Sequence, residues 1–331
     1  MTVTGPSAMI DPVRILSDAP YAETFFDGFD EKLLSIDGSE VFIRIGGSGP
    51  AILLLHGYPQ TSAMWHKIAP VLAERYTVVC ADLRGYGRSA KPTSDAHHNA
   101  YSKRAMATDL VGAMNSLGHE RFLIGAHDRG ARVAHRLAAD HPDKVLGLAT
   151  LDIAPTREMY ADATSAFAAA YWHWYWLIQP SPMPEQMIGA DPDYFWCKKC
   201  CSGSAGALPF DRQALNEYLA AFRDPAVIHA SCEDYRAAYG VDIAHDDDDP
   251  QPLPMPVLAL WGDKGAIEAH FNCLSLWRKR ASDVRGRSLP GGHYLAEECP
   301  GAVLAEWLPF FNQIVDAGAE PAPQLEAANR A

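Results

Sequence analysis

An aspartate occupies a position where its neighbours would allow it to act as a nucleophile. Asp128 lies between an apolar run at 121–124 and a stretch with helical apolar spacing at 133–139. The small residues Ala126 and Gly130 flank it at two positions on either side. This spacing predicts a strand, a tight turn and a helix, and small neighbours allow such a turn to hold one side chain over a sheet. The stretch therefore has the form of a nucleophile elbow with aspartate as the nucleophile.

Two further residues could complete a catalytic set. Asp152 follows the next predicted strand, and His293 lies in a glycine turn after the last one. The carboxyl ends of parallel strands are where open α/β sheets place their sites. Asp263, after a strand at 257–261, is an alternative acid, but Gly265 stands two positions further on, where many hydrolases place the carboxylate. We therefore favour Asp152 as the residue that orients the histidine.

A carboxylate nucleophile limits the reaction. Its attack on an ester or amide would give an anhydride, which is uphill, whereas attack on a saturated carbon gives an ordinary ester. His293 could then activate water against the carbonyl carbon of Asp128. We expect the backbone N–H groups of Tyr58 and Arg129 to stabilise the resulting oxyanion. The expected reaction is hydrolytic displacement at a saturated carbon, either dehalogenation or epoxide opening.

Two arginines beside the predicted nucleophile indicate the charge of the substrate. Arg129 and Arg132 are three residues apart on the first turn of the predicted helix, so their side chains share a face. Guanidinium groups match carboxylates geometrically. The alternative is that Arg132 pairs with a structural acid. We expect a small anionic substrate, because a neutral haloalkane or a simple epoxide would not need two arginines.

Strands alternate with helical patterns in most of the chain, which favours an α/β fold with a mainly parallel sheet and helices on both faces. After Pro155 the chain is rich in aromatic residues with helical spacing, and we expect a helical cap inserted after the strand that ends at Asp152. We expect a loosely structured leader at residues 1–25 and an α/β core formed by residues 26–155 and 251–316. We expect the cap, with an acidic proline-rich return linker, at residues 156–250, and a disordered tail at residues 317–331.

Composition restricts the partners. The chain has 331 residues and a formal net charge of −13, which disfavours nucleic acid. We see no secretory signal or membrane span, so we expect a cytoplasmic protein with no membrane partner. The seven cysteines show no disulfide spacing, and the cluster of Cys197, Cys200 and Cys201 lacks a second ligand pair for zinc. We expect free thiols, no metal and no cofactor.

Several motifs together resemble those of the fluoroacetate dehalogenases of the α/β-hydrolase superfamily, over residues 30–315. They are His127–Arg132, Tyr171–Trp174, Cys232–Arg236, His56–Thr61, Leu151–Thr156 and Gly291–His293. The resemblance implies an α/β-hydrolase fold and hydrolysis of short haloacetates through a covalent ester on Asp128. It also implies that Arg129 and Arg132 bind the substrate carboxylate and that the protein is a homodimer. The leaving halide would be held by His173, Trp174 and Tyr235.

Other interpretations stay open at this point. The aspartate elbow is shared with epoxide hydrolases, in which a tyrosine such as Tyr235 would protonate the oxygen. A non-catalytic binding protein on the same fold is less favoured, because nucleophile, acid and histidine are all present. We expect the remaining aromatic residues of the cap run, Tyr171, Trp172 and Trp176, to form its core.

Overall fold

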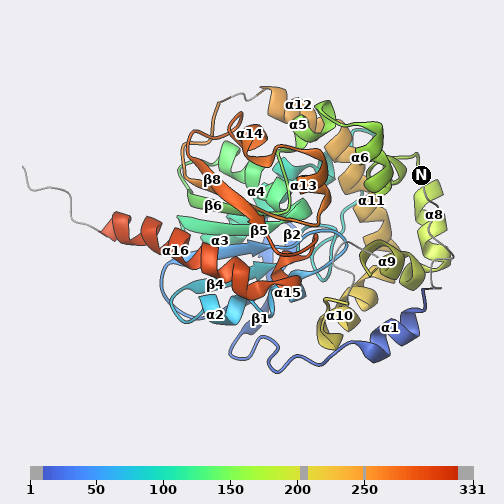
Figure 1. Cartoon of the computed structure of the whole chain (residues 1–331), viewed down its shortest axis with the longest axis horizontal. Coiled ribbons are helices and arrows are strands. Elements are labelled where there is room, and N and C mark those ends of the chain that lie inside the picture. Colours follow the sequence, from blue (N-terminus) through green and yellow to red (C-terminus); the bar gives the residue numbers. More distant parts are fainter. Residues whose placement is uncertain (1–9, 202–207, 249–250, 320–331) are drawn as a thin grey trace, which may run out of the picture.

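A mainly parallel sheet forms the centre of the molecule (Figure 1). The computed structural model describes residues 10–201, 208–248 and 251–319. In the described residues the strands are β1 Asp30–Ile36, β2 Ser39–Gly46, β3 Ala51–Leu55, β4 Thr77–Ala81, β5 Phe122–His127, β6 Val145–Leu151, β7 Val257–Gly262 and β8 Val284–Leu289. Their order is β1-β2-β4-β3-β5-β6-β7-β8, and β2 pairs antiparallel with both β1 and β4, whereas the other pairs are parallel. The predicted α/β fold is confirmed.

The central strands β3 and β5 place the elbow. Every residue of both strands is buried, as expected for strands covered by helices on both faces. Their register pairs Leu54 with Gly125 and Leu55 with Ala126, so the two strands end level with each other. The loop that follows β3 therefore lies beside Asp128, the residue after β5.

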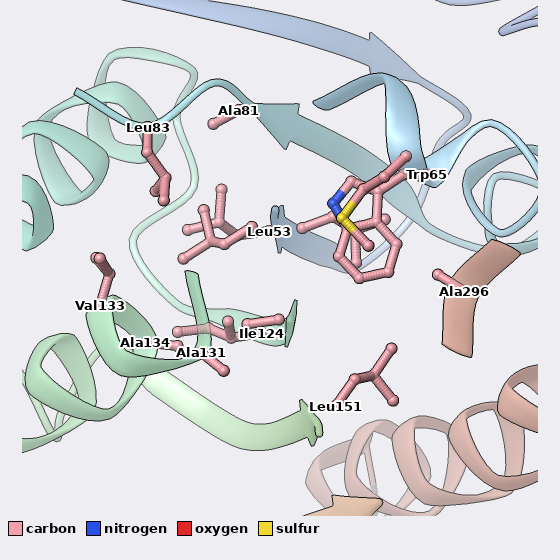
Figure 2. Packing of buried hydrophobic residues seen from close by; sticks show 14 of the residues in the cluster. Leu53, Trp65, Ala81, Leu83, Ile124, Ala131, Val133, Ala134, Leu151 and Ala296 are labelled. Atoms are coloured by element: carbon pink, nitrogen blue, oxygen red, sulfur yellow. The ribbon is translucent and has the colours of Figure 1, made fainter. Parts of the chain in front are cut away.

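Helices cover both faces of the sheet and bury its apolar side chains. Outside the cap the described helices are α1 Pro12–Asp18, which contacts helices of the cap and not the sheet, and then α2 Ala69–Leu72, α3 Lys103–Ser116, α4 Asp128–Asp140, α13 Ala266–His270, α14 Cys273–Trp277, α15 Leu295–Glu298 and α16 Pro300–Ala319. Figure 2 shows Ile124 of β5 close to Ala131 and Ala134 of α4. This packing fixes the start of α4 against the sheet, and hence the position of Asp128.

One predicted helix differs from the structure. The sequence favours a helix from Trp65 to Arg75, but the chain forms a 3₁₀ turn at Ser62–Trp65 and then the four-residue helix α2. Pro70 lies in the first turn of α2. A proline has no N–H to donate, so it is accommodated at a helix start and not in a helix interior. The apolar spacing that suggested one helix is therefore divided between two short elements.

In the described residues between β6 and β7, at 152–201, 208–248 and 251–256, the regular elements are all helices. We call residues 156–250 the cap; its helices are α5 Thr156–Ala161, α6 Ser165–Ala170, α7 Trp172–Leu177, α8 Met183–Ala190, α9 Pro192–Cys200, α10 Arg212–Phe222, α11 Pro225–Tyr239 and α12 Val241–Asp248. In Figure 1 helices α8 to α11 lie together beyond one end of the sheet. The division into a core and a cap as separate domains stays a prediction.

The chain ends and the return linker differ from the loose segments that we expected. Helix α1 lies within the leader and against α9 and α10, and the Arg212 guanidinium of α10 donates to the Ala19 carbonyl at 3.1 Å. The acidic run belongs to α12 up to Asp248, and Asp246 is buried against Arg136. Residues 317–319 belong to α16, whereas 249–250 and 320–331 lie outside the described residues. Among the described helices none is long and apolar enough to cross a membrane.

Candidate active site

Asp128 occupies a strained turn between β5 and α4. Its φ of 45° lies in the left-handed region, which a non-glycine residue adopts only where its surroundings enforce it. Two glycines make this possible. A Cβ on Gly57 would lie 2.5 Å from the Asp128 Cβ, and one on Gly130 would lie 2.3 Å from the His56 carbonyl oxygen. Glycine at positions 57 and 130 therefore allows the backbone to pack closely around Asp128, because a Cβ at either position would clash.

The Asp128 carboxylate is ionised and held by the loop after β3. Its Oδ1 accepts a hydrogen bond from the Tyr58 N–H at 3.0 Å. Burial by itself would raise the pKa of Asp128, but the neighbouring charges of His293, Arg132 and Arg129 hold that pKa well below its usual value. The Arg129 N–H belongs to the first turn of α4, where helix N–H groups have no intrahelical acceptor. Of the two backbone groups predicted for the oxyanion, the Tyr58 N–H therefore contacts the Asp128 carboxylate, and the Arg129 N–H directly follows Asp128 in the chain.

The structure brings His293 and Asp152 to this carboxylate. His293 Nε2 lies 3.8 Å from Asp128 Oδ2, and His293 Nδ1 lies 2.6 Å from Asp152 Oδ2. The other oxygen of Asp152 accepts from the Gly262 N–H at 3.0 Å, and Asp152 has a φ of 51°. The alternative acid, Asp263, instead accepts from the Gly291 N–H at 3.1 Å. The carboxylate that contacts the imidazole is therefore that of Asp152.

The two arginines have different surroundings. Arg129 is fully buried and donates from Nε and Nη2 to the Asp234 carboxylate at 2.9 and 2.6 Å. Arg132 is also buried, but within the described residues it donates only to neutral groups, namely the Ala154 carbonyl at 3.2 Å, the Thr156 hydroxyl at 3.0 Å and the Met159 sulfur at 3.3 Å. Burial and the charge of Arg129 lower the pKa of Arg132. The alternative that Arg132 pairs with a structural acid on its helix is wrong, because among the described residues Arg132 has no carboxylate partner.

The predicted halide-binding residues lie in two adjoining groups. His173 and Tyr235 pack with Tyr58, with ring centroids 5.8 Å apart for His173 and Tyr235 and 5.2 Å apart for Tyr58 and Tyr235. Trp174 lies instead under the Arg132 guanidinium, 4.7 Å from its ring centroid. All three predicted residues are buried. The cap therefore covers the elbow with aromatic side chains that carry polar atoms.

Several buried donors around Asp128 lack a hydrogen-bond partner within the described part of the chain. They are Arg129 Nη1, Arg132 Nε, Trp174 Nε1 and the hydroxyls of Tyr58, Tyr160 and Tyr235. Buried polar groups in proteins almost always have partners, and each one left unpaired costs about 1–3 kcal/mol. Unpaired donors of this number in one place indicate a site for a ligand that accepts hydrogen bonds.

Three contacts to His293 and the arginines were not predicted from the sequence. The His127 ring contacts that of His293 at 4.7 Å between centroids, and its Nε2 lies 2.8 Å from the His293 carbonyl oxygen. Tyr171, expected in the cap core, places its hydroxyl 3.4 Å from His293 Nδ1. Asp234 is the third. His127 directly precedes the nucleophile position, so sequence proximity could have identified it; nothing in the sequence pairs Asp234 with Arg129.

Two other expectations concern side chains near the cap surface. Trp172 was expected in the cap core, but it is 41% exposed, so that prediction is wrong. Trp176 is partly buried and packs against Phe195, with ring centroids 5.5 Å apart. All seven cysteines are free thiols, and Cys197 and Cys200 are buried. Within the described residues no group of His, Cys, Asp and Glu side chains could hold a metal ion.

Comparisons with known proteins agree with the fold. Residues 50–300 match the model of the alpha/beta hydrolase fold family. A fluoroacetate dehalogenase from Burkholderia sp. is 47% identical over 86% of this chain and 95% of its own length. A soluble epoxide hydrolase from Corynebacterium sp. strain C12 is 29% identical over 83% and 95%. A candidate alpha/beta hydrolase from Nostoc sp. PCC 7120 superposes with a TM-score of 0.83 at 50% identity, covering 87% of this chain and 98% of that one. The sheet order, the elbow and these matches place the chain in the alpha/beta hydrolase fold family, to which it belongs.

Proposed function

We propose that this protein is a hydrolytic dehalogenase of short haloacetates, with fluoroacetate as a substrate. The observation that carries the proposal is the ionised Asp128 on its elbow, surrounded by unpaired cationic and aromatic donors. The arginines favour an anion, and the cap donors favour a leaving group that gains negative charge. The similarity to the Burkholderia sp. fluoroacetate dehalogenase supports the same substrate class.

The first half of the reaction forms an ester. Arg132 and the free Nη1 of Arg129 would bind the substrate carboxylate. One oxygen of Asp128 attacks the α-carbon, its new C–O bond replaces the carbon–halogen bond, and the halide leaves with the bonding electron pair. His173, Trp174 and Tyr235 would donate hydrogen bonds to the departing halide. Fluoride is a poor leaving group, so donors placed where its charge develops lower the barrier most.

The second half hydrolyses that ester. His293 Nε2, oriented through Nδ1 by Asp152, takes a proton from water as the water oxygen attacks the carbonyl carbon of Asp128. The oxyanion is stabilised by the N–H groups of Tyr58 and Arg129. Collapse of the tetrahedral intermediate breaks the bond between that carbon and the ester oxygen, and His293 returns its proton to that oxygen. Glycolate therefore departs with an oxygen that began in Asp128, and the remaining proton of the water is released to solvent. The carboxylate is regenerated with an oxygen from water.

Fluoride release from fluoroacetate tests the proposal, with a fluoride-selective electrode as the detector and Asp128→Asn as the control. We expect release by the wild type and none above background by the variant, because an amide is a far weaker nucleophile than a carboxylate. Failure of the wild type to release halide from either fluoroacetate or chloroacetate would contradict the proposal.

An epoxide hydrolase is the second candidate. Tyr235 favours it, because a buried, unpaired phenol near Asp128 suits protonation of an epoxide oxygen. The similarity to the Corynebacterium sp. epoxide hydrolase gives it further support. Diol formation from styrene oxide separates the two candidates, since a neutral epoxide has no carboxylate for Arg132 to bind and its turnover would be insensitive to changes at Arg132.

A further inference from the structure

A cavity of about 450 Å³ opens beside the candidate active site. Its lining includes Tyr171, His173 and His293, so it adjoins both the histidine and the predicted halide-binding group. The His293 side chain is 15% exposed, whereas that of Asp128 is 5% exposed. Solvent therefore reaches the site on the side of His293, and we call this cavity the mouth.

The charged side chains of the mouth are mostly lysines. Lys198 and Lys199 come from the end of α9, and Lys264 follows β7. Glu298 is the carboxylate in the lining, and it already accepts hydrogen bonds from the N–H groups of Gly292 and Tyr294, at 2.5 and 2.8 Å. Lys199 and Lys264 form no ion pair within the part of the chain that the structure describes. Positive charge thus lines the mouth of a protein whose net charge is −13.

The charge of Lys199 also acts inside the site. Burial lowers the pKa of His173 well below its usual value, and the charge of Lys199 lowers it further. The same two causes, with His293, act on the pKa of His127, which falls to about 3. A cation that disfavours protonation of these imidazoles favours the presence of an anion at the same place.

We propose that the mouth collects small carboxylate anions, and that Lys199 and Lys264 draw them toward Asp128 against the repulsion of an acidic protein. This inference rests on the proposed function, because it takes the haloacetate as the anion. Clefts lined by one sign of charge raise the local concentration of the opposite ion, and the gain falls as salt screens it. The lysines would raise the occupancy of the site without taking part in the chemical steps.

The expected effect is modest and depends on salt. Coulomb's law in water gives about a two-fold change in local anion concentration for each unit charge at a separation of about 10 Å. Removing both lysines should therefore lower kcat/KM for chloroacetate about four-fold at an ionic strength of about 0.01 M, where the Debye length is about 30 Å. At about 0.5 M salt the screening length is under about 10 Å and the difference should disappear. The turnover number at saturation should not change.

The kinetic test compares the wild type with Lys199→Gln/Lys264→Gln. The matched control is Lys32→Gln, which removes the same kind of charge from β1, at the opposite edge of the sheet from β8. We expect a flatter dependence of kcat/KM on salt in the double variant and a wild-type dependence in the control. Equal salt dependence in all three proteins would overturn the inference. The charge reversal Lys264→Glu also changes the charge by two units, so it should show about the same four-fold loss at low salt from a single position, and it serves as a second variant.

A binding measurement separates this inference from the proposed function. Acetate and the neutral acetamide are titrated into Asp128→Asn, with and without the two lysine substitutions, and binding is followed by calorimetry. Acetate affinity should fall about four-fold at low salt without the lysines, whereas acetamide binding should not change. If the wild type released no halide but acetate binding still depended on the lysines, the proposed function would be refuted and the inference about the mouth would stand. Acetate binding that is undetectable, or that is indifferent to the lysines, would refute the mouth.

Discussion

The polar side chains on the sheet and those in the cap are held in opposite ways. Asp128 and Asp152 accept hydrogen bonds from backbone N–H groups, and Asp152 also contacts His293. In the cap, the donors of Trp174 and Tyr235 are buried without partners among the described residues. The residues at the strand ends that would react are therefore held by hydrogen bonds, whereas the cap donors that would bind the leaving halide have no hydrogen-bond partner among the described residues.

The two arginines repeat this contrast on a single helix. Arg129 is neutralised by Asp234, which also accepts from the Tyr86 hydroxyl at 2.6 Å and contacts Lys103. Arg132 has only neutral hydrogen-bond partners in the part of the chain that the structure describes. The first arginine ties the core to α11 of the cap, whereas the second has no ion-pair partner among the described residues and, in the proposed function, binds the substrate carboxylate.

The largest effect should come from the histidine of the sheet. In His293→Gln, displacement by Asp128 should still proceed but water should not be activated, so turnover should fall on the order of 10⁴-fold. Rapid quench should show one equivalent of halide per enzyme, followed by arrest. His97→Gln, in an exposed loop, is the control and should turn over normally. Continued multiple turnover by His293→Gln would contradict the assignment.

A smaller loss should follow from removing a cap donor. Trp174→Phe and Tyr235→Phe keep the aromatic packing but delete the N–H or the O–H. By analogy with lost oxyanion donors, each should lower kcat for fluoroacetate about 100-fold, or about 3 kcal/mol. Bromoacetate should suffer less, because bromide is a better leaving group. Trp172→Phe, on an exposed ring, is the matched control, and equal losses for both halides would show that these donors do not act on the halide.

The arginines should separate binding from stability. Arg132→Gln should lower kcat/KM for haloacetates about 30-fold, since a hydrogen bond to a charged group contributes about 2 kcal/mol. Arg129→Gln should instead lower the free energy of unfolding by about 3 kcal/mol, because it leaves the buried Asp234 carboxylate with one cation fewer. Thermal melts and kinetics on both variants check this. The opposite pattern would mean that Arg129 carries the recognition.

His127 is a positioning residue in this account, with a weaker effect. Its neutral ring donates from Nε2 to the His293 carbonyl, and burial with the charge of His293 lowers its pKa to about 3. Losing the bond in His127→Leu should slow ester hydrolysis about five-fold, for a hydrogen bond of about 1 kcal/mol. His127→Gln should restore part of the rate, because its amide can donate. The readout is the fraction of enzyme present as the ester during turnover, which a general loss of structure would not raise.

The smallest effect on activity should be at the junction of core and cap. Glu297 of α15 accepts from Gln60 of the core and from Tyr218 of the cap, at 2.5 and 3.0 Å. Burial raises its pKa from about 4.5 to about 8. The native state thus binds this proton more tightly than the unfolded chain does, so stability should fall as the pH rises from about 4.5 through 8. Denaturant unfolding at several pH values should show a weaker decline for Glu297→Gln; an unchanged decline would assign it to other groups.

The sequence was sufficient for the sheet and for the order of nucleophile, acid and histidine, because apolar runs and glycine turns are local signals. The structure brings together Asp128, Asp152 and His293 at the predicted strand ends. The sequence did not predict the contact of Asp234 with Arg129, which is 105 residues away. It also did not predict the exposure of Trp172, because the aromatic residues around Trp172 suggested a buried position. Contacts between the core and the cap depend on tertiary packing, which cannot be predicted from the apolar spacing within a strand or helix.

The central claim is that Asp128 attacks the substrate carbon and is itself attacked by water. A single turnover of chloroacetate in ¹⁸O-labelled water, followed by mass spectrometry of the peptide that contains Asp128, tests it most directly. The account predicts that the heavy oxygen appears in Asp128 and that the first glycolate released is unlabelled. Label in the first glycolate, with none in Asp128, would show direct attack by water on the substrate and would contradict the account.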